Sequence, residues 1–480
     1  MNIYPRVLLL ILLLSPPVWS IAADSALPEL GDSSAISLTP EQERQIGGEV
    51  MRRMREGGYI ISDPLISSYI ELVGRSLAAH AQSDQAFTFF VVDAPGINAF
   101  ALPGGYIGIH SGLILASRTE SELASVIAHE IAHVTQHHLA RGVEQANRMQ
   151  LPISVALIAA ILLSGGDPNV ANAAMAASIG GSQQMQLNFT RAHEHEADRV
   201  GMQFLASSEF DPRGMADFFS RLQDDSRYYG EGVPEFLRTH PVTTARMAEA
   251  QSAAERYPRK MRVDTTPYMV AKARIQLHHS KGPSELLKEL DTEKKKQNGD
   301  DTSIYLRAIT LMALQRPAEA QHLLLQLLSK APESIAYRDT LGQLHYQQGA
   351  YQQAASLYQE GLKRYPHNEL LTLALVNNQL ALQHHAQARL QLQQHLSRAP
   401  NSINAYRLLA QLESETGNQA ASHLAQAEYY LLQDDPQSAL EQLKLAKRID
   451  DLDFYHTSRI EAMMDEILEL LEKRRTLLQE

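Results

Sequence analysis

The sequence predicts a mixed α+β domain followed by an all-α solenoid built from pairs of helices. Two observations support this prediction. His129 and His133 are four residues apart in a segment whose apolar residues follow a helical period. Further along, Pro332, Pro366 and Pro400 recur every 34 residues, which is typical of an array of short helical repeats. A chain of 480 residues is too long for one hydrophobic core, so we expect two or three domains.

Composition and charge exclude several classes of partner. The formal net charge is −12 and the sequence has no basic block, which argues against nucleic-acid binding and against electrostatic docking on anionic lipid. The sequence contains no cysteine, so disulfides, thiolate metal ligands and lipidated cysteines are excluded. Stability must therefore come from packing.

Residues 1–22 have the pattern of a cleavable signal peptide. Arg6 provides a positive start, an apolar run covers Val7–Leu14, and small residues follow at Ser20–Ala23. The alternative is a membrane anchor, but the run is short and two prolines follow it. Export without cysteine predicts a periplasmic location.

The elements before the two histidines predict helices and a small sheet. We expect helices over about 39–56 and 64–81, each opened by a proline. Aromatic and β-branched residues predict a strand over Phe87–Val92. Asn98–Leu102, a Pro-Gly-Gly turn and Tyr106–His110 predict a hairpin. Its strand could hold a peptide in extended form, and the alternative is a purely structural role.

The helix that carries the histidines has a start signal and an apolar face. Thr119–Glu122 matches a T-x-x-E capping box, and apolar residues follow at Leu123, Val126, Ile127, Ile131 and Val134. His129 and His133 face the same way, so their imidazoles can bind one Zn²⁺. Glu130 lies about 100° around the helix, within reach to act as a general base toward water.

Two apolar segments follow the motif helix. Ile153–Leu163 is too short to span a bilayer, and Val170–Gly181 is rich in small residues. We expect two buried or site-covering helices. The alternative is contact with a membrane surface or with an unfolded substrate.

A second segment supplies the carboxylate that a His₂Glu zinc site needs. Glu194 and Asp198 are i and i+4, so they share one helix face. We expect Glu194 to bind the metal and Asp198 to accept the N–H of a ligand imidazole. Glu196 is the rival ligand, but it points about 200° away from Glu194 and is expected to be a solvated charge. Four nearby histidines are expected to be bystanders: His137, His138, His193 and His195.

A third segment contains His240 directly before Pro241, in the pattern HPxxxxR. A histidine placed before a proline that starts a helix can point into a cleft. The alternative is that His240 only caps the helix that begins at Pro241.

These motifs together resemble the zinc peptidases related to HtpX and the CAAX prenyl protease. HEIAH, EHEAD and HPxxxxR, with Asn98–Gly105 ahead of them, carry the resemblance over about residues 40–260. It implies that His129, His133 and Glu194 bind zinc, that Glu130 is the catalytic base and that His240 lies near the substrate carbonyl. The motif is not flanked by membrane-spanning segments, as in the exported members.

The C-terminal half has the 34-residue period of tetratricopeptide repeats. The pattern predicts repeats at 301–334, 335–368, 369–402 and about 420–453. Residues 266–298 are interpreted as a degenerate first repeat, 403–416 as a helix out of phase and 454–480 as a capping helix. We therefore predict a peptidase domain over 23–263 and a repeat domain over 264–480.

The combination of the two halves resembles the periplasmic β-barrel assembly-enhancing proteases of Gram-negative bacteria. The resemblance implies a zinc endopeptidase that supports assembly of outer-membrane proteins, degrades stalled ones and contacts the barrel assembly machinery through its repeats. Two alternatives are a repeat-mediated chaperone with a latent protease, and an aminopeptidase.

One hypothesis concerns restraint of the protease. A zinc ion with three protein ligands has one open position, which His240 could close in a resting state. The glycines of Tyr228–Gly232 could act as hinges for this movement. On opening, His240 could donate a hydrogen bond to the substrate carbonyl.

Overall fold

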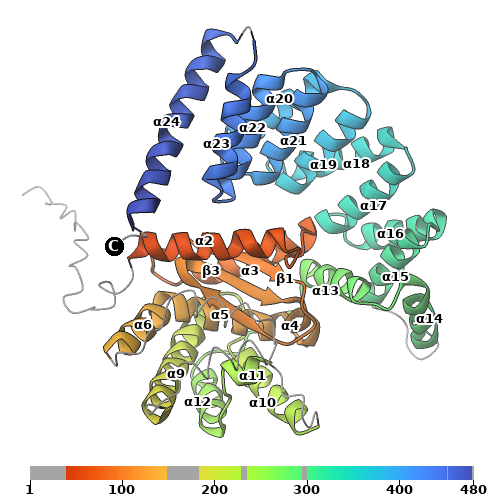
Figure 1. Cartoon of the computed structure of the whole chain (residues 1–480). Helices are drawn as coiled ribbons and strands as arrows, with labels where there is room; N and C mark the ends of the chain where they lie inside the picture. Colours follow the sequence, from red (N-terminus) through yellow and green to blue (C-terminus); the bar gives the residue numbers. More distant parts are fainter. Residues whose placement is uncertain (1–38, 149–182, 229–234, 295–299, 451, 478–480) are drawn as a thin grey trace, which may run out of the picture.

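The computed structural model describes residues 39–148, 183–228, 235–294, 300–450 and 452–477. Figure 1 shows a mixed domain of helices around a small sheet, and a series of helix pairs that leaves this domain and curves back over it. The predicted fold class, an α+β peptidase domain followed by an all-α solenoid, is confirmed.

The sheet has three strands in the order β1-β3-β2. β1 (Thr88–Val92) pairs in parallel with β3 (Tyr106–His110), and β2 (Ala99–Leu102) pairs antiparallel with β3. The hairpin turn η1 (Pro103–Gly105) contains two glycines at φ +78° and +82°, conformations that L side chains rarely adopt. The predicted hairpin is therefore confirmed, and β2 is an edge strand.

Both faces of the sheet are covered. Phe90 and Phe100 pack against α2 (Pro40–Glu56), whereas Phe89 and Ile107 face the main core with α3 (Pro64–Ala78). This alternation follows the two-residue period of a strand. α2 begins with Thr39 and Gln42 as a complete capping box and with Pro at its first turn.

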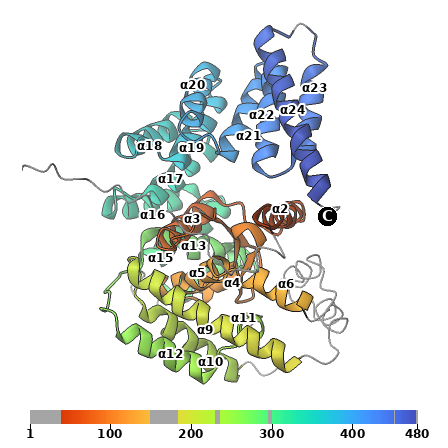
Figure 2. The same ribbon diagram turned by 90° about the vertical axis from the view of Figure 1, so that its left-hand side faces the viewer.

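The motif helix, α5 (Glu120–Thr135), lies at the centre of the domain. It packs between α3, the sheet and the helices α9 (Gln183–Ser207) and α10 (Arg213–Tyr228), which Figure 2 shows on the far side from the repeats. Its predicted capping box is only half present. Thr119 accepts the Glu122 N–H, but the Glu122 carboxylate accepts from Arg118 N–H and pairs with Arg221. The short helix α4 (Ser111–Ala116) precedes α5.

The repeat region contains six helix pairs in the described part of the chain. Their bounds are α13 (Thr266–His278), α14 (Pro283–Lys294), α15 (Asp301–Ala313), α16 (Pro317–Lys330), α17 (Ile335–Gln347), α18 (Tyr351–Arg364), α19 (Glu369–Ala381), α20 (His385–Leu396), α21 (Ile403–Glu415), α22 (Gln419–Leu432), α23 (Pro436–Lys447) and α24 (Phe454–Leu477).

The prediction that residues 403–416 are out of phase is wrong. α17, α19 and α21 begin at residues 335, 369 and 403, so the 34-residue period continues. The turns inside successive pairs repeat it too, because a residue with positive φ occurs at Gln315, Gly349, Gln383 and Gly417. The period was missed because Ser422 occupies the position of Ala354 and Ala388, and Asp434 the position of the recurring prolines.

α13 contributes side chains to two cores. Tyr268 and Ile275 belong to the peptidase core, whereas Val270 and Ala273 belong to the core of the first repeats. The predicted boundary between residues 263 and 264 remains a prediction.

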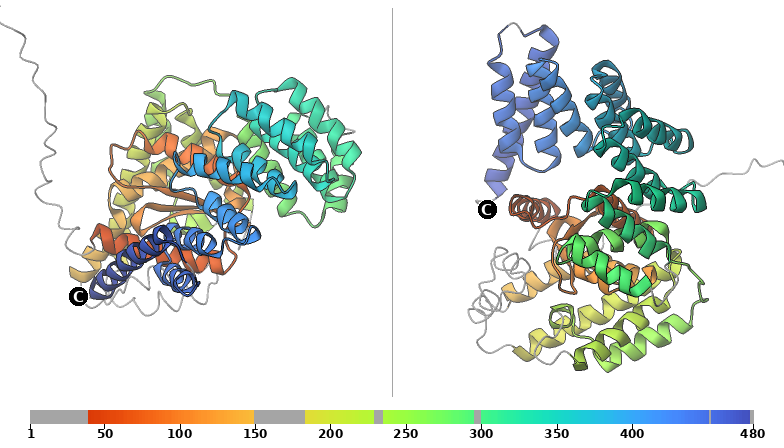
Figure 3. Two further views of the ribbon diagram at one scale, coloured as in Figure 1. Left: turned by 90° about the horizontal axis from the view of Figure 1, so that it is seen from above. Right: turned by 90° about the vertical axis from the view of Figure 1, so that its right-hand side faces the viewer.

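The far end of the repeats also touches the peptidase domain. Arg55 on α2 donates from Nη1 to the carbonyl oxygen of Gln433 at 3.4 Å. The neighbouring Asp434 forms an ion pair with Arg474 of α24. Figures 1 and 3 show that α24 descends to the end of α2.

Among the described residues, no helix is both long and apolar enough to cross a membrane. The signal-peptide prediction for residues 1–22 and the predicted helices Ile153–Leu163 and Val170–Gly181 lie outside those residues.

Candidate metal centre

Two neighbouring helices bring the predicted ligands together. His129 and His133 lie on α5, and Glu194 lies on α9. The two helices can approach closely because α9 has a glycine where they meet. A Cβ on Gly201 would lie 3.1 Å from backbone atoms of Ala128 and His129. This approach directs Glu194 toward the histidines.

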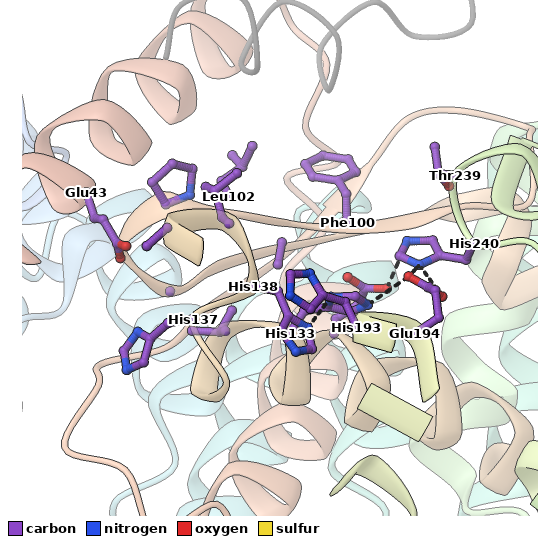
Figure 4. A pocket seen from close by; sticks show the side chains of 18 residues that line it. Glu43, Phe100, Leu102, His133, His137, His138, His193, Glu194, Thr239 and His240 are labelled. Atoms are coloured by element: carbon purple, nitrogen blue, oxygen red, sulfur yellow. Dashed lines mark hydrogen bonds and ion pairs between the residues drawn. The ribbon is translucent and has the colours of Figure 1, made fainter. Parts of the chain in front are cut away.

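Four side chains converge on one point. Their ligand atoms, from His129, His133, Glu194 and His240, all lie within 4.8 Å of one another. His129 Nε2 lies 3.0 Å from His133 Nε2 and 3.4 Å from Glu194 Oε2, and His133 Nε2 lies 3.3 Å from Glu194 Oε1. His240 Nδ1 lies 3.0 Å from Glu194 Oε1 and 3.4 Å from His129 Nε2. In Figure 4, His133, Glu194 and His240 point toward one another.

This donor set fits a tetrahedral metal ion such as zinc. Ligand bonds of about 2.0–2.1 Å place neighbouring ligand atoms about 3.3 Å apart, close to the five distances above. Imidazole and carboxylate donors are the usual non-sulfur ligands of zinc. The side chains of His129 and Glu194 are 2% and 4% exposed, so these ligand atoms are largely withdrawn from water.

Asp198 and Arg246 support the site from behind. Asp198 Oδ1 lies 3.0 Å from His129 Nδ1, on the side of the ring away from the other ligand atoms. Arg246 on α12 (Thr244–Glu255) donates from Nε and Nη2 to Asp198 at 2.6 and 2.8 Å. Its Nη1 lies 2.8 Å from Glu194 Oε2 and donates to the carbonyl oxygen of Pro241 at 2.9 Å. The guanidinium of Arg246 therefore contacts the predicted ligand Glu194, the carboxylate of Asp198 and the backbone directly after His240.

Sequence reasoning gave no role to Arg246, although its place in HPxxxxR was the available signal. Burial alone would raise the pKa of Glu194, but the charge of His240 and hydrogen bonds from the site histidines hold that pKa well below its ordinary value. Burial would likewise raise the pKa of Asp198, but hydrogen bonds from Arg246 and His129 lower it.

His240 ends a short helix and faces the ligands. Its N–H donates to the Phe236 carbonyl oxygen at 2.7 Å, at the end of α11 (Glu235–Thr239), and its ring stacks on Phe236 at 5.0 Å. The expectation that Pro241 begins a helix is wrong, because α12 begins at Thr244 and is capped by Thr243. Capping at Pro241 therefore does not explain His240.

Glu130 lies beside the predicted ligands and lines a cleft. It is 1% exposed, and its Oε1 has no hydrogen-bond partner among the residues that the structure describes. The same oxygen lies 3.6 Å from His240 Nε2. The cleft has a volume of about 330 Å³ and is also lined by Glu43 of α2 and by residues 100–105 of the hairpin (Figure 4).

His138, which was expected to be a bystander, contacts a predicted ligand and connects it to Glu196. His138 is buried at 6% exposure, and its Nδ1 lies 2.9 Å from His133 Nδ1. Its Nε2 lies 3.2 Å from Glu196 Oε2, so Glu196 is a partly exposed carboxylate with partners in the protein and not a charge paired with water alone. Burial, with the nearby positive charges, lowers the pKa of His138 to about 2. The error arose because the turn between α5 and α6 (His138–Arg148) was not foreseen.

The other histidines differ in their surroundings. His195 pairs with Glu249 at 2.8 Å at the surface, away from the ligands, as expected of a bystander. His193 is buried and stacks on His138, and His137 lines the cleft. The proposed hinge lies almost entirely outside the described residues, which omit 229–234.

Comparison with known proteins identifies the families that the two halves of the chain match. A family model described as Peptidase family M48 matches residues 64–254, and a tetratricopeptide repeat model matches residues 345–412. Fold and site therefore define a metalloprotease joined to a repeat array.

The chain belongs to the family of beta-barrel assembly-enhancing proteases. Relatives of that name in Yersinia pestis and Escherichia coli K12 are 32% and 33% identical over 458 and 460 residues, which cover 95% of this chain and 94% of each relative. A Vibrio cholerae protein is 35% identical over 475 residues, 98% of either chain. A mitochondrial metalloendopeptidase OMA1 from Arabidopsis thaliana is 27% identical over 228 residues, 47% of this chain and 44% of its own.

Proposed function

We propose that this chain is a zinc endopeptidase of the bacterial periplasm that supports assembly of outer-membrane β-barrel proteins and degrades those that fail to assemble. The observation that carries the proposal is the buried set of His129, His133 and Glu194 beside Glu130, at the floor of a cleft bordered by an edge strand. The names of the relatives support the class of substrate.

Each residue of the site has a distinct role in this proposal. His129, His133 and Glu194 hold one Zn²⁺, and Asp198 fixes the orientation of the His129 ring. When bound, zinc supplies a Lewis acid that polarises the scissile carbonyl and lowers the pKa of water. Glu130 takes the proton of the attacking water and passes it to the leaving amine.

The substrate binds as an extended chain along β2. This strand pairs only with β3 in the described sheet, so its other edge can accept a further strand beside the cleft. This mode needs no chain terminus and therefore favours cuts inside the substrate. N-terminal sequencing of the products tests this point, because release of single N-terminal residues would instead show an aminopeptidase.

His240 restrains the enzyme at rest. Its Nδ1 faces Glu194 and His129, and its Nε2 faces Glu130, so the ring occupies the space between the base and the ligands. We propose that His240 is the fourth zinc ligand in this closed state. When the segment moves, the imidazole donates a hydrogen bond to the substrate carbonyl oxygen.

His240→Ala tests restraint, and His195→Ala on the surface of α9 is the control. If restraint dominates, His240→Ala cleaves proteins that resist the wild-type chain. If carbonyl stabilisation dominates, cleavage of a good substrate falls by roughly 10²-fold or more. Unchanged cleavage of both substrates would contradict both roles.

Glu130→Gln separates peptide hydrolysis from chaperone-like binding. Without its general base the variant should bind zinc but lose cleavage by several orders of magnitude. Outer-membrane proteins trapped on this full-length variant in the periplasm would identify the substrates. If assembly support survives the substitution, the repeat array carries that function, and a variant that still cleaves would refute the role of Glu130.

The repeat array, residues 264–480 in the predicted division, contacts the barrel assembly machinery. Stacked helix pairs offer an extended surface for such contacts. Photo-crosslinking from single positions of α17–α22 in the full chain should yield adducts with that machinery, whereas adducts only from the peptidase domain would refute this assignment.

Sequencing the N-terminus of the exported protein tests removal of residues 1–22.

A further inference from the structure

The two ligand histidines are supported from behind by different groups. His129 presents Nε2 to the other ligands and Nδ1 to Asp198, which Arg246 holds. His133 also presents Nε2 to the ligands, but its Nδ1 faces His138. His138 in turn faces Glu196, which Arg141 contacts at 3.0 Å. The second chain of contacts has one more imidazole than the first.

The carboxylate at the end of this chain fixes where the protons lie. Glu196 is paired with the Arg141 guanidinium and can only accept, so His138 donates to it from Nε2. The remaining nitrogen of a neutral His138, Nδ1, is then an acceptor. It accepts the N–H of His133 Nδ1 at 2.9 Å, which leaves the lone pair of His133 on Nε2, toward the other ligands.

The surroundings of His138 hold its ring in the orientation that this requires. His137, directly before it, has a positive φ of 51°, and this turn brings His138 back beside His133. The ring of His193 on α9 stacks on His138 at 4.1 Å with 9° between the planes. α6 and α9 thus both fix the imidazole, and its exposure is only 6%.

We infer that His138 and Glu196 are positioning residues that set the tautomer and the ring orientation of the zinc ligand His133. The inference rests on the proposed zinc site and deepens it. Neither residue belongs to the group of four side chains that could hold the metal, although His138 also lines the cleft. Partners of this kind behind a ligand imidazole typically change metal affinity by 10- to 100-fold.

The test measures zinc affinity of the full-length chain by competition with a chromophoric chelator. His138→Phe keeps an aromatic ring against His193 but removes the acceptor, so zinc affinity should fall roughly 10- to 100-fold. His138→Gln restores an acceptor oxygen and should recover most of that loss. The zinc affinity of Glu196→Ala should lie between the affinities of His138→Phe and His138→Gln. The control His195→Ala should bind zinc as the wild-type chain does.

Two further readouts separate positioning from loss of folding. Thermal unfolding of the metal-free proteins reports stability, and the visible spectrum of the cobalt-substituted protein reports ligand geometry. We expect an altered cobalt spectrum for His138→Phe and Glu196→Ala, at melting temperatures that do not explain the loss of affinity.

The outcomes distinguish this inference from the proposed function. Wild-type affinity and spectrum in His138→Phe and Glu196→Ala would overturn the inference and leave the metallopeptidase proposal standing. Equal losses in His138→Gln and His138→Phe would also overturn it, because the acceptor would then not matter. A wild-type chain that takes up no zinc would overturn both.

Discussion

Glu194 and Asp198 in the metal centre and Asp339 in the repeat array are all buried acidic residues, and the whole residues are 3%, 9% and 1% exposed. In the metal centre, Arg246 and the histidines contact both carboxylates, and both pKa values are lowered. In the repeat array, Gln343 donates to one oxygen of Asp339 at 2.6 Å, and the other has no hydrogen-bond partner within the described chain.

The positively charged residue near Asp339 is Arg274, and its guanidinium bonds to other groups. Arg274 on α13 pairs with Asp63 at 2.6 Å and donates to the Tyr305 hydroxyl at 3.1 Å. Burial therefore raises the pKa of Asp339 to about 7, although Arg274 partly offsets it. Burial raises the pKa in both regions, and only in the metal centre do directly bonded positive groups reverse the direction of the shift.

The largest change in stability should follow from removing the guanidinium of Arg246, which pairs with both carboxylates of the metal centre. Arg246→Met leaves Glu194 and Asp198 buried without their common partner, and we expect a loss of about 3–5 kcal/mol in unfolding free energy, together with weaker zinc binding. Arg246→Lys should not rescue it, because an ammonium group cannot reproduce the bidentate contact with Asp198. Chemical denaturation measures the loss, with the exposed Arg256→Met on the same helix segment as a control. A loss below about 1 kcal/mol would contradict the comparison.

The repeat array should respond to pH in a way that Asp339 explains. The folded pKa of about 7 lies above the ordinary 3.8, so the stabilising contribution of the neutral acid is fully present below about pH 3.8 and is lost as pH rises through 7. Asp339→Asn should therefore gain at most about 4 kcal/mol relative to wild type at pH 8.5, and little at pH 4. Denaturation at both pH values checks this, with Glu360→Gln on the surface as control. A gain that is equal at both pH values would show that charge is not the cause.

A smaller effect is expected from Arg274→Met. The substitution removes the contact between α13 and Asp63, the residue that caps α3, and should cost about 1–3 kcal/mol. It also removes the positive charge that lowers the pKa of Asp339, so the loss of stability on raising the pH should continue to a higher pH, and be larger in total, than in wild type. The double variant with Asp339→Asn tests the coupling. Strict additivity at every pH would disprove it.

The smallest effect should come from an ion pair that stays in water. Lys330 and Asp301 lie 2.6 Å apart, but their side chains are 51% and 38% exposed. Lys330→Ala should change the unfolding free energy by less than about 1 kcal/mol, and added salt should reduce even that change. A larger loss would mean that distance, and not burial, governs these pairs.

Local periodicity made part of the metal centre predictable. His129 and His133, and Glu194 and Asp198, are i and i+4 on their helices, and the structure places each pair on one face. The contacts of His138 were missed because they depend on the turn at His137, a non-glycine residue with positive φ that has no sequence signature. The role of Arg246 was missed because it depends on the packing of α12 against α9.

The repeat array shows the same limit. Small residues and prolines at fixed positions predicted the pairs between residues 301 and 402, because those residues fit close packing and helix ends. Ser422 breaks this pattern at a buried position, where its hydroxyl donates to the Ala410 carbonyl oxygen at 2.8 Å. A buried serine that bonds across the pair preserves the fold without preserving the consensus.

The contact between Arg55 and Gln433 has a mechanical consequence. If a stack of repeats were attached only at its first repeat, its other end could bend freely, because each repeat contacts only its neighbours. Here α13 packs into the peptidase core at one end of the stack, and α2 contacts the stack near its other end. The repeat stack is therefore attached to the peptidase domain at two places. A change in the curvature of the repeat stack would therefore act on α2 through this contact. The same helix lines the cleft through Glu43.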